Sequence, residues 1–248
     1  MFGLTVLSPH CDDAVFDLYL CLSKWARVFS PLNVVTFFSI SEYAPHVPRA
    51  SRSDISVRRR REDRRALRTI STVACLRYLN LLDAPLRLNI AAAEICSRET
   101  AALLTSEDIQ RLGISVRRYC GFGGVLCPLG LGGHVDHLAV KYAASNEIKP
   151  GRLAFYEDLP YSLWTSESEL IECVANTQER ARVKLRPAFI RATKSRRWAK
   201  FQAARIYQSQ VDSSEAKAIA DFSARYGGAE RIWIPTQSAF WRQAASDE

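Results

Sequence analysis

The stretch FGLTVLSPHCDDAVFD (residues 2–17) places a histidine and two adjacent aspartates directly after a short apolar run. Phe2–Leu7 is rich in strand-forming residues, Asp13–Val28 has the pattern of a helix, and Asn33–Ile40 is a second apolar run. This order predicts a βαβ unit. Both runs are apolar on both faces, as central strands of a parallel sheet are, so we expect helices on both sides of the sheet.

The rest of the chain continues the alternation of helical patterns and short apolar runs. Helices are expected at Val57–Ala74, Ala91–Thr105, Ser106–Arg117, after the glycine-rich LGLGG turn (129–133), and at Arg197–Val211 and Ser214–Tyr226. Strands are expected at Cys75–Leu82, Gly124–Pro128 and Arg152–Tyr156, with a strand or edge segment at Glu179–Ala188 and a short closing strand in ARYGGAERIWIP (224–235). The pattern predicts an α/β fold with a mostly parallel sheet.

Bulk composition sets limits on the class of protein. The 248 residues carry a net charge of +8, which suits a polyanionic partner but equally favours solubility. Seven cysteines, an odd number without a CxxC pair, indicate reduced thiols. No run approaches the roughly 18 apolar residues of a membrane span, and the N-terminus lacks a signal-peptide pattern. We therefore expect a cytoplasmic protein without a membrane span.

Histidine and aspartate gather at two places in the chain. Of the four histidines, His10, His134 and His137 each lie within two residues of an aspartate. Both clusters follow apolar strand-like runs. Because ligands of open parallel sheets bind beyond the carboxyl ends of the strands, we expect both clusters on one rim. A single histidine or aspartate at a helix start is usually a surface or capping residue, but two such clusters are hard to explain by caps alone.

The adjacent aspartates indicate a divalent cation. Neighbouring buried carboxylates repel one another unless a cation or a hydrogen-bond donor intervenes. A catalytic zinc ion has three protein ligands and an open position for water, and His10, Asp13 and His137 form such a set. Asp12, held as an anion beside the metal, would accept a proton from that water.

Two motifs resemble those of a known family. SPHCDDA (8–14) resembles the AHPDDE-type signature of the PIG-L/LmbE family of zinc-dependent N-deacetylases, and GGHVDHLAV (132–140) resembles its HPDH-type signature. The resemblance implies a Rossmann-like three-layer sandwich, here one domain over residues 1–248, with the metal at the carboxyl edge of the sheet. It implies zinc, or another divalent metal, bound by His10, Asp13 and His137. Asp12 would be the general base, and His134 would polarise the amide carbonyl or stabilise the oxyanion.

The resemblance extends beyond the two motifs. The family's arginine and glutamate helix segment is matched by Arg59 and Glu62, and its aspartate after the next strand by Asp83; the arginine and the aspartate would bind the sugar. FYEDLPY (155–161) and KFQAARIYQSQ (200–210) are similar to a branch acting on glycosylated natural products or surface saccharides. The implied activity is hydrolytic removal of an N-acyl group, acetyl in the first place, from an amino sugar of a small molecule or glycoconjugate.

The sequence also departs from the family pattern. Ala14 and Cys11 replace a glutamate and a proline that are not ligands. A tyrosine that precedes the second motif in some members is absent, and Gly132 and Gly133 occupy its place. Because residues 58–61 are four consecutive arginines, the choice of Arg59 depends on its spacing to Glu62.

One alternative function uses the same fold as a non-catalytic module that binds a polyanion or nucleic acid. Its contact surface would be the basic run Val57–Arg68. Such a run is more typical of a solvated helix face, and no aromatic residues are interleaved with it, so nucleic-acid binding is not expected. The sequence leaves open which molecule carries the sugar, because loops 41–56 and 157–167 shape the outer pocket and their conformations cannot be read from the sequence. It also leaves the oligomeric state open.

Overall fold

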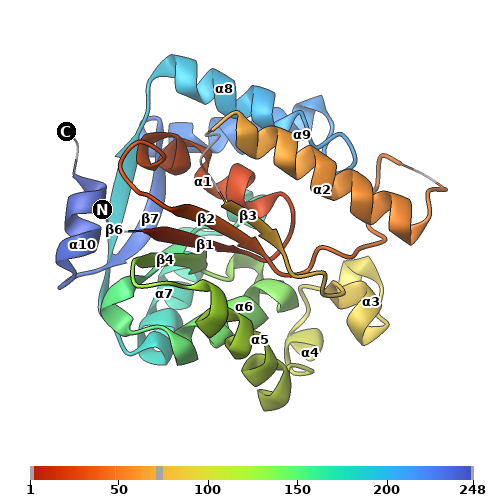
Figure 1. Ribbon diagram of the computed structural model, residues 1–248, viewed down its shortest axis with the longest axis horizontal. Helices are drawn as coiled ribbons and strands as arrows, with labels where there is room; N and C mark the ends of the chain where they lie inside the picture. Colours follow the sequence, from red (N-terminus) through yellow and green to blue (C-terminus); the bar gives the residue numbers. More distant parts are fainter. Residues whose placement is uncertain (1–2, 48, 71–74, 247–248) are drawn as a thin grey trace.

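A seven-stranded sheet forms the centre of the protein, in the strand order β3-β2-β1-β4-β5-β7-β6 (Figure 1). The computed structural model describes residues 3–47, 49–70 and 75–246. The strands are β1 (Leu4–Ser8), β2 (Leu32–Thr36), β3 (Cys75–Tyr78), β4 (Gly124–Pro128), β5 (Leu153–Tyr156), β6 (Leu185–Arg191) and β7 (Ala229–Pro235). Strands β1 to β5 pair in parallel, whereas β7 is antiparallel to both β5 and β6. The expected α/β fold with a mostly parallel sheet is confirmed.

Helices cover both faces of the sheet. They are α1 (Asp13–Trp25), α2 (Arg52–Arg68), α3 (Ala84–Leu88), α4 (Arg98–Ala101), α5 (Ser106–Tyr119), α6 (Val135–Glu147), α7 (Glu167–Ala181), α8 (Lys194–Ala204), α9 (Ser213–Asp221) and α10 (Ala239–Ala245). Helices α1, α2, α8 and α9 lie on one face, and α5, α6 and α7 lie on the other (Figure 1). The three layers of the expected sandwich are present.

Two apolar cores, one on each face, explain why the central strands are largely apolar. Every residue of β1 and of β4 is buried. Leu4 and Val6 of β1 face the core that contains Trp25 of α1, whereas Leu7 faces the core under α5 and α6. Because alternate side chains of a strand point to opposite faces, a strand covered on both sides buries every side chain, and the two polar residues of β1, Thr5 and Ser8, are small and buried as well.

Several elements differ in extent from the sequence expectation. The strand expected at Asn33–Ile40 ends at Thr36, and Ile40 contributes only an isolated bridge to Leu82. The helix expected at Ala91–Thr105 is two short turns, a 3-10 turn at Ala92–Glu94 and then α4. Ser97 separates these turns because its side chain accepts from Thr100 N and caps α4.

Other element boundaries also differ from the expectation. Helix α2 begins at Arg52 rather than Val57, because the Ser51 side chain accepts from Asp54 N. Of the expected segment Glu179–Ala188, the first three residues end α7 and the strand begins only at Leu185. Helices α8 and α9 are shorter than expected, and α7 and α10 were not expected. Residues 2 and 71–74 of the expected elements lie outside the described residues.

The strand order places both histidine clusters at one point. From β1 the chain builds outward to β2 and β3 on one side and, after a reversal, to β4 and β5 on the other. A crevice forms at the carboxyl ends of the two strands that flank such a reversal. SPHCDD follows β1 and the second cluster follows β4, so both lie at this crevice. Within the described ranges, no helix has the length and apolar character needed to cross a membrane.

Candidate metal centre

A tight turn after β1 positions the first two candidate ligands. Ser8 Oγ donates to the His10 carbonyl at 2.7 Å and accepts from Ala14 N at 3.3 Å, which closes the turn onto α1. His10 N donates to Asp13 Oδ2 at 2.6 Å. His10 Nδ1 lies 3.7 Å from the same carboxylate oxygen. The local chain therefore brings the His10 imidazole and the Asp13 carboxylate to one side of the turn.

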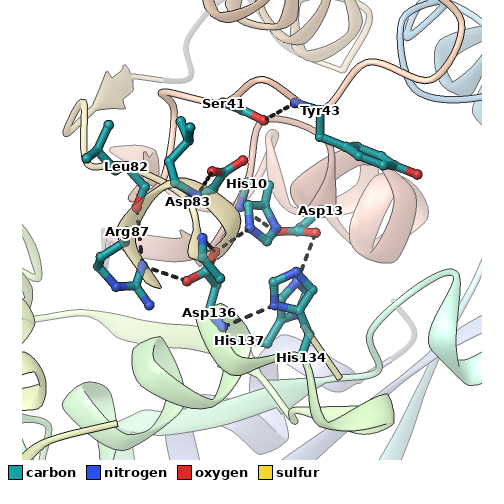
Figure 2. Close-up of polar contacts among 12 residues, drawn as sticks. His10, Asp13, Ser41, Tyr43, Leu82, Asp83, Arg87, His134, Asp136 and His137 are labelled. Atoms are coloured by element: carbon teal, nitrogen blue, oxygen red, sulfur yellow. Dashed lines mark hydrogen bonds and ion pairs between the residues drawn. The ribbon is translucent and has the colours of Figure 1, made fainter. Parts of the chain in front are cut away.

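The two other histidines of the candidate site, His134 and His137, come from the segment that joins the glycine turn after β4 to the start of α6. His134 caps α6, since its Nδ1 accepts from Asp136 N at 3.1 Å, and His137 lies one turn further along the helix. The ring centroid of His10 lies 4.8 Å from that of His134 and 5.2 Å from that of His137. His137 Nε2 is 3.6 Å from Asp13 Oδ1 (Figure 2). Segments more than 120 residues apart thus meet around one point.

The donor set fits a divalent cation. Potential ligand atoms of His10, His134 and His137 lie within 4.8 Å of one another, as do those of His10, Asp12 and Asp13. Burial raises the pKa of Asp13, with His137 and His10 opposing the rise, so the carboxylate needs positive charge nearby to remain an anion. Two imidazoles and one carboxylate are a common ligand set of catalytic zinc, with a position left for water.

His134 is a neutral imidazole at physiological pH. Burial, together with the nearby His10 and His137, lowers the pKa of His134 well below its ordinary value. Its Nδ1 accepts a backbone hydrogen bond, so the proton of the neutral ring is on Nε2. A protonated His134 is therefore not required for the role expected from the sequence, because the neutral ring already offers an N–H donor.

His137 has the opposite electrostatic environment. Burial alone would lower its pKa, but Asp13 and Asp158 outweigh that effect and raise the pKa to about 9. Asp158 Oδ1 lies 2.7 Å from His137 Nδ1, and both side chains are almost fully buried. The negative charge around His137 is what a bound dication would neutralise.

Asp136 supports the site from the side opposite Asp13. Its Oδ2 accepts from Ala84 N at 2.9 Å and lies 3.1 Å from His10 Nε2, while Arg87 Nη1 donates to Oδ1 at 2.8 Å (Figure 2). Burial alone would raise the pKa of Asp136, but the contacts with His10 hold it below its usual range. With Nε2 of His10 engaged by Asp136, Nδ1 is the nitrogen that faces Asp13.

The cluster lies in a cavity of about 650 Å³. Such a volume is typical of small-molecule sites. Arg59 lines the cavity and is buried, with Nη1 donating to Ser41 Oγ at 2.9 Å and Nη2 to Asp12 Oδ2 at 3.3 Å. Asp83 also lines it, while its Oδ1 accepts from Leu86 N at the start of α3. Both residues that were expected to bind the sugar therefore line the same cavity as the candidate metal ligands.

The neighbours of Arg59 face away from the cavity. Arg58 pairs with Glu62 at 3.3 Å, Arg60 donates to the Ser39 carbonyl, and Arg61 is exposed. Of the four consecutive arginines, Arg59 is the one that lines the cavity. Spacing to Glu62 therefore selected the arginine that the structure places beside Asp12.

A tyrosine from another loop fills the space beside Gly132. A Cβ atom at Gly132 would lie 2.7 Å from the Cβ and Cγ atoms of Tyr161, and Gly132 has a φ of +75°. The Tyr161 ring packs edge-on to His134 and His137, with centroids 5.9 and 5.7 Å away. Tyr161 thus occupies the space that a side chain at position 132 would need.

Fold and site together define the class of protein: an α/β protein with a candidate metal centre at the strand-order reversal of a parallel sheet. No protein-family model matches the chain. The sequence is similar to 2'-N-acetylparomamine deacetylase of Streptomyces fradiae, with 35% identity over 167 residues, 64% of this chain and 58% of that protein. The match thus spans less than two thirds of that relative's length.

Solved structures of proteins named as deacetylases share the fold. Teicoplanin deacetylase in its zinc-inhibited form superposes with a TM-score of 0.66 and 21% identity over 96% of this chain and 100% of that chain. A40926 pseudoaglycone deacetylase gives a TM-score of 0.63 and 23% identity over 94% and 96%. The sequence relative and these structures are PIG-L/LmbE-like deacetylases, so the resemblance that the two motifs predict is confirmed.

Proposed function

We propose that this protein is a metal-dependent hydrolase that removes an N-acyl group, acetyl in the first place, from an amino sugar. The observation that carries the proposal is the meeting of His10, Asp13 and His137 in the cavity that Asp12 also lines. The set supplies two imidazoles and a carboxylate for a cation, and a second carboxylate for proton transfer.

The substrate class follows from the relatives and agrees with the cavity. The sequence relative is named for 2'-N-acetylparomamine, and the structural relatives are named for teicoplanin and for the pseudoaglycone of the antimicrobial reagent A40926. The lining residues of the cavity include two hydrogen-bonding groups, Arg59 and Asp83, and an exposed aromatic residue, Trp164. We therefore propose an N-acetylated amino sugar of a natural product or glycoconjugate as substrate.

Asp12 is the proposed general base. A zinc ion bound by His10, Asp13 and His137 would polarise the amide carbonyl and lower the pKa of a water molecule to about 7. Asp12 accepts a proton from the attacking water and passes it to the departing amine nitrogen as the C–N bond breaks. Arg59 orients the Asp12 carboxylate through the 3.3 Å contact to Oδ2. The products are a carboxylate and a free amino sugar.

His134 is the proposed oxyanion donor. Its neutral ring carries the proton on Nε2, and the ring borders the same cavity as Asp12. The Nε2–H group donates to the carbonyl oxygen as negative charge develops there. Loss of one such donor typically removes about 3 kcal/mol of transition-state stabilisation.

The test is amine release from a panel of N-acetylated aminoglycosides and N-acetylglucosamine conjugates by the zinc-loaded protein. Asp12→Asn removes the base and leaves the three ligands intact, so zinc stoichiometry should stay at the wild-type value while kcat falls about 10²–10⁴-fold. A well-folded, zinc-loaded wild type that releases no amine from any member of the panel contradicts the proposal.

The alternative of a polyanion-binding module is not favoured. The relatives in sequence and in structure are deacetylases. Within the basic run, Arg59 faces the cavity and is engaged by Asp12, while Arg58 is engaged by Glu62. One arginine of the run, Arg59, therefore belongs to the candidate site, and the other arginines form an ordinary solvated helix face.

A further inference from the structure

We propose that Asp158, which follows β5, is the positioning residue that determines which nitrogen of His137 faces the metal site. This inference rests on the proposed metal site and adds to it a residue outside both motifs. Asp158 is fully buried. Its Oδ1 lies 2.7 Å from His137 Nδ1. The other carboxylate near the ring, that of Asp13, lies farther away, at 3.6 Å from Nε2.

The second oxygen of Asp158 is held by two backbone donors. Gly130 N donates to Oδ2 at 2.8 Å and Leu131 N at 2.9 Å. Both donors belong to the glycine turn that leads into α6. The carboxylate therefore ties the end of β5 to the turn that precedes the second motif, and its rotation is restricted from both sides.

The backbone of Asp158 is held as well. Ser162 N and Ser162 Oγ both donate to the Asp158 carbonyl at 2.8 Å, and Leu159 N donates to Asp17 Oδ1 on α1, also at 2.8 Å. The loop is thus attached to the helix that carries Asp13. A displacement of Asp158 would require breaking contacts with α1 and with the glycine turn together.

An ionised carboxylate can only accept, so the hydrogen bond requires a proton on His137 Nδ1. Nε2 then carries the lone pair, and this is the nitrogen that lies near Asp13. Carboxylates in this position raise the basicity of a ligating histidine and hold its orientation, and their loss typically costs about 10–100-fold in metal affinity. Asp158 would do this for His137.

Asp158→Asn tests the inference with almost no change in shape. The side-chain oxygen of the introduced asparagine is expected to keep accepting from Gly130 N and Leu131 N, because turning the amide would direct its N–H₂ group at two N–H donors. The N–H₂ group then faces His137 Nδ1 and donates to it. This arrangement favours the proton on Nε2, where it blocks the metal.

The first measurement is zinc affinity by competition with a chromophoric chelator. Asp158→Asn should weaken zinc binding about 10–100-fold. The matched control is Glu157→Gln, the adjacent buried carboxylate, which contacts Arg231, Tyr226 and Trp233 and no histidine. The control should bind zinc within about twofold of wild type. Equal affinity in wild type and Asp158→Asn, or an equal loss in both variants, overturns the inference.

The second measurement does not depend on any variant. Long-range ¹H–¹⁵N correlation spectra of the zinc-loaded wild type should show His137 protonated on Nδ1 and metal-bound through Nε2; the chain has only four histidines to assign. Metal bound through Nδ1, or no zinc bound at all, overturns the inference. A wild type that binds zinc through Nε2 and releases no amine would contradict the proposed function and still support the role of Asp158.

Discussion

At the scale of single residues, the fold gives chemically identical neighbours different tasks. Arg59 holds Ser41 Oγ and Asp12 with two nitrogens of one planar guanidinium. Lysine has a single ammonium group and cannot reproduce that fork. Arg59→Lys should therefore lower kcat/KM for amine release about 10–100-fold, the equivalent of one charged hydrogen bond. Steady-state kinetics of the zinc-loaded enzyme provide the measurement.

The adjacent Arg58 is the matched control for that variant. It lies on the same helix and pairs with Glu62, and its side chain is about half exposed. Arg58→Lys should leave kcat/KM within about twofold of wild type, because lysine keeps the positive charge, the half-exposed arginine end of the pair is screened by solvent, and Arg58 does not line the cavity. Equal kinetics for Arg59→Lys and wild type would refute the assigned role of Arg59.

A second residue-scale prediction concerns pH. Burial raises the pKa of Asp63 to about 8, against the hydrogen bonds donated by Tyr78 and Tyr207, which favour the anion. The unfolded value is about 3.9. Between these values the native state holds a proton that the unfolded state has lost, so stability falls as pH rises. The limit is about 1.4 kcal/mol per pH unit.

Asp63→Asn removes the carboxyl group that binds this proton. Urea unfolding at pH 5, 6, 7 and 8 should show a steeper loss of stability in the wild type than in Asp63→Asn, which has no carboxyl group to titrate at this position. The asparagine oxygen can still accept from one tyrosine hydroxyl, so the variant should fold. Parallel curves for the two proteins would show that Asp63 is ionised in the native state at pH 5.

The sequence predicted which residues form the cluster, but it did not predict the contacts and protonation states of these residues. Histidines with aspartates at two strand ends indicated His10, Asp13 and His137, because the carboxyl ends of neighbouring parallel strands must meet. The supporting role of Asp158 was not predicted, since its contact with His137 spans 21 residues and depends on the conformation of a loop. The neutral state of His134 depends on burial, which only the folded chain determines.

At the scale of elements, the central strands were the most predictable parts. They are covered on both faces and read as continuous apolar runs. Helix α7 was missed, although Ser166 and Glu169 form a capping box and Leu170, Val174, Thr177 and Ala181 recur at helical spacing. The signal was present in the sequence. Edges and ends of elements were misjudged where a single capping side chain sets the boundary, as Ser51 does for α2.

The glycine turn before α6 yields a prediction at this scale. Gly132→Ala introduces a Cβ atom 2.7 Å from the Tyr161 ring at a φ of +75°. Left-handed backbone at a non-glycine residue costs about 1–2 kcal/mol, and the displaced ring adds to that cost. Urea unfolding should show a loss of about 2 kcal/mol or more. Gly151→Ala, with nothing within 4 Å of the new Cβ, is the control; an equal effect of both variants would rule out the packing argument.

At the scale of the whole molecule, a buried ion pair joins the layer of helices to the antiparallel end of the sheet. Lys200 of α8 donates to Glu230 Oε1 of β7 at 2.9 Å, and both side chains are buried. The other oxygen of Glu230 accepts from Cys21 N of α1 at 2.8 Å. One carboxylate thus links α1, α8 and β7. Because α1 carries Asp13 in its first turn, the pair also holds the helix that supplies this candidate metal ligand.

Lys200→Met should be strongly destabilising, because it leaves the Glu230 carboxylate buried without its cation. Removing one partner of a buried pair costs about 3–5 kcal/mol, measurable as a lower midpoint of urea unfolding. The double variant Lys200→Met/Glu230→Gln should recover much of that loss, since the neutral amide oxygen can still accept from Cys21 N. If the double variant is no more stable than Lys200→Met, the lost stability comes from packing of the lysine stem, and the charge balance across α1, α8 and β7 is not what holds these elements together.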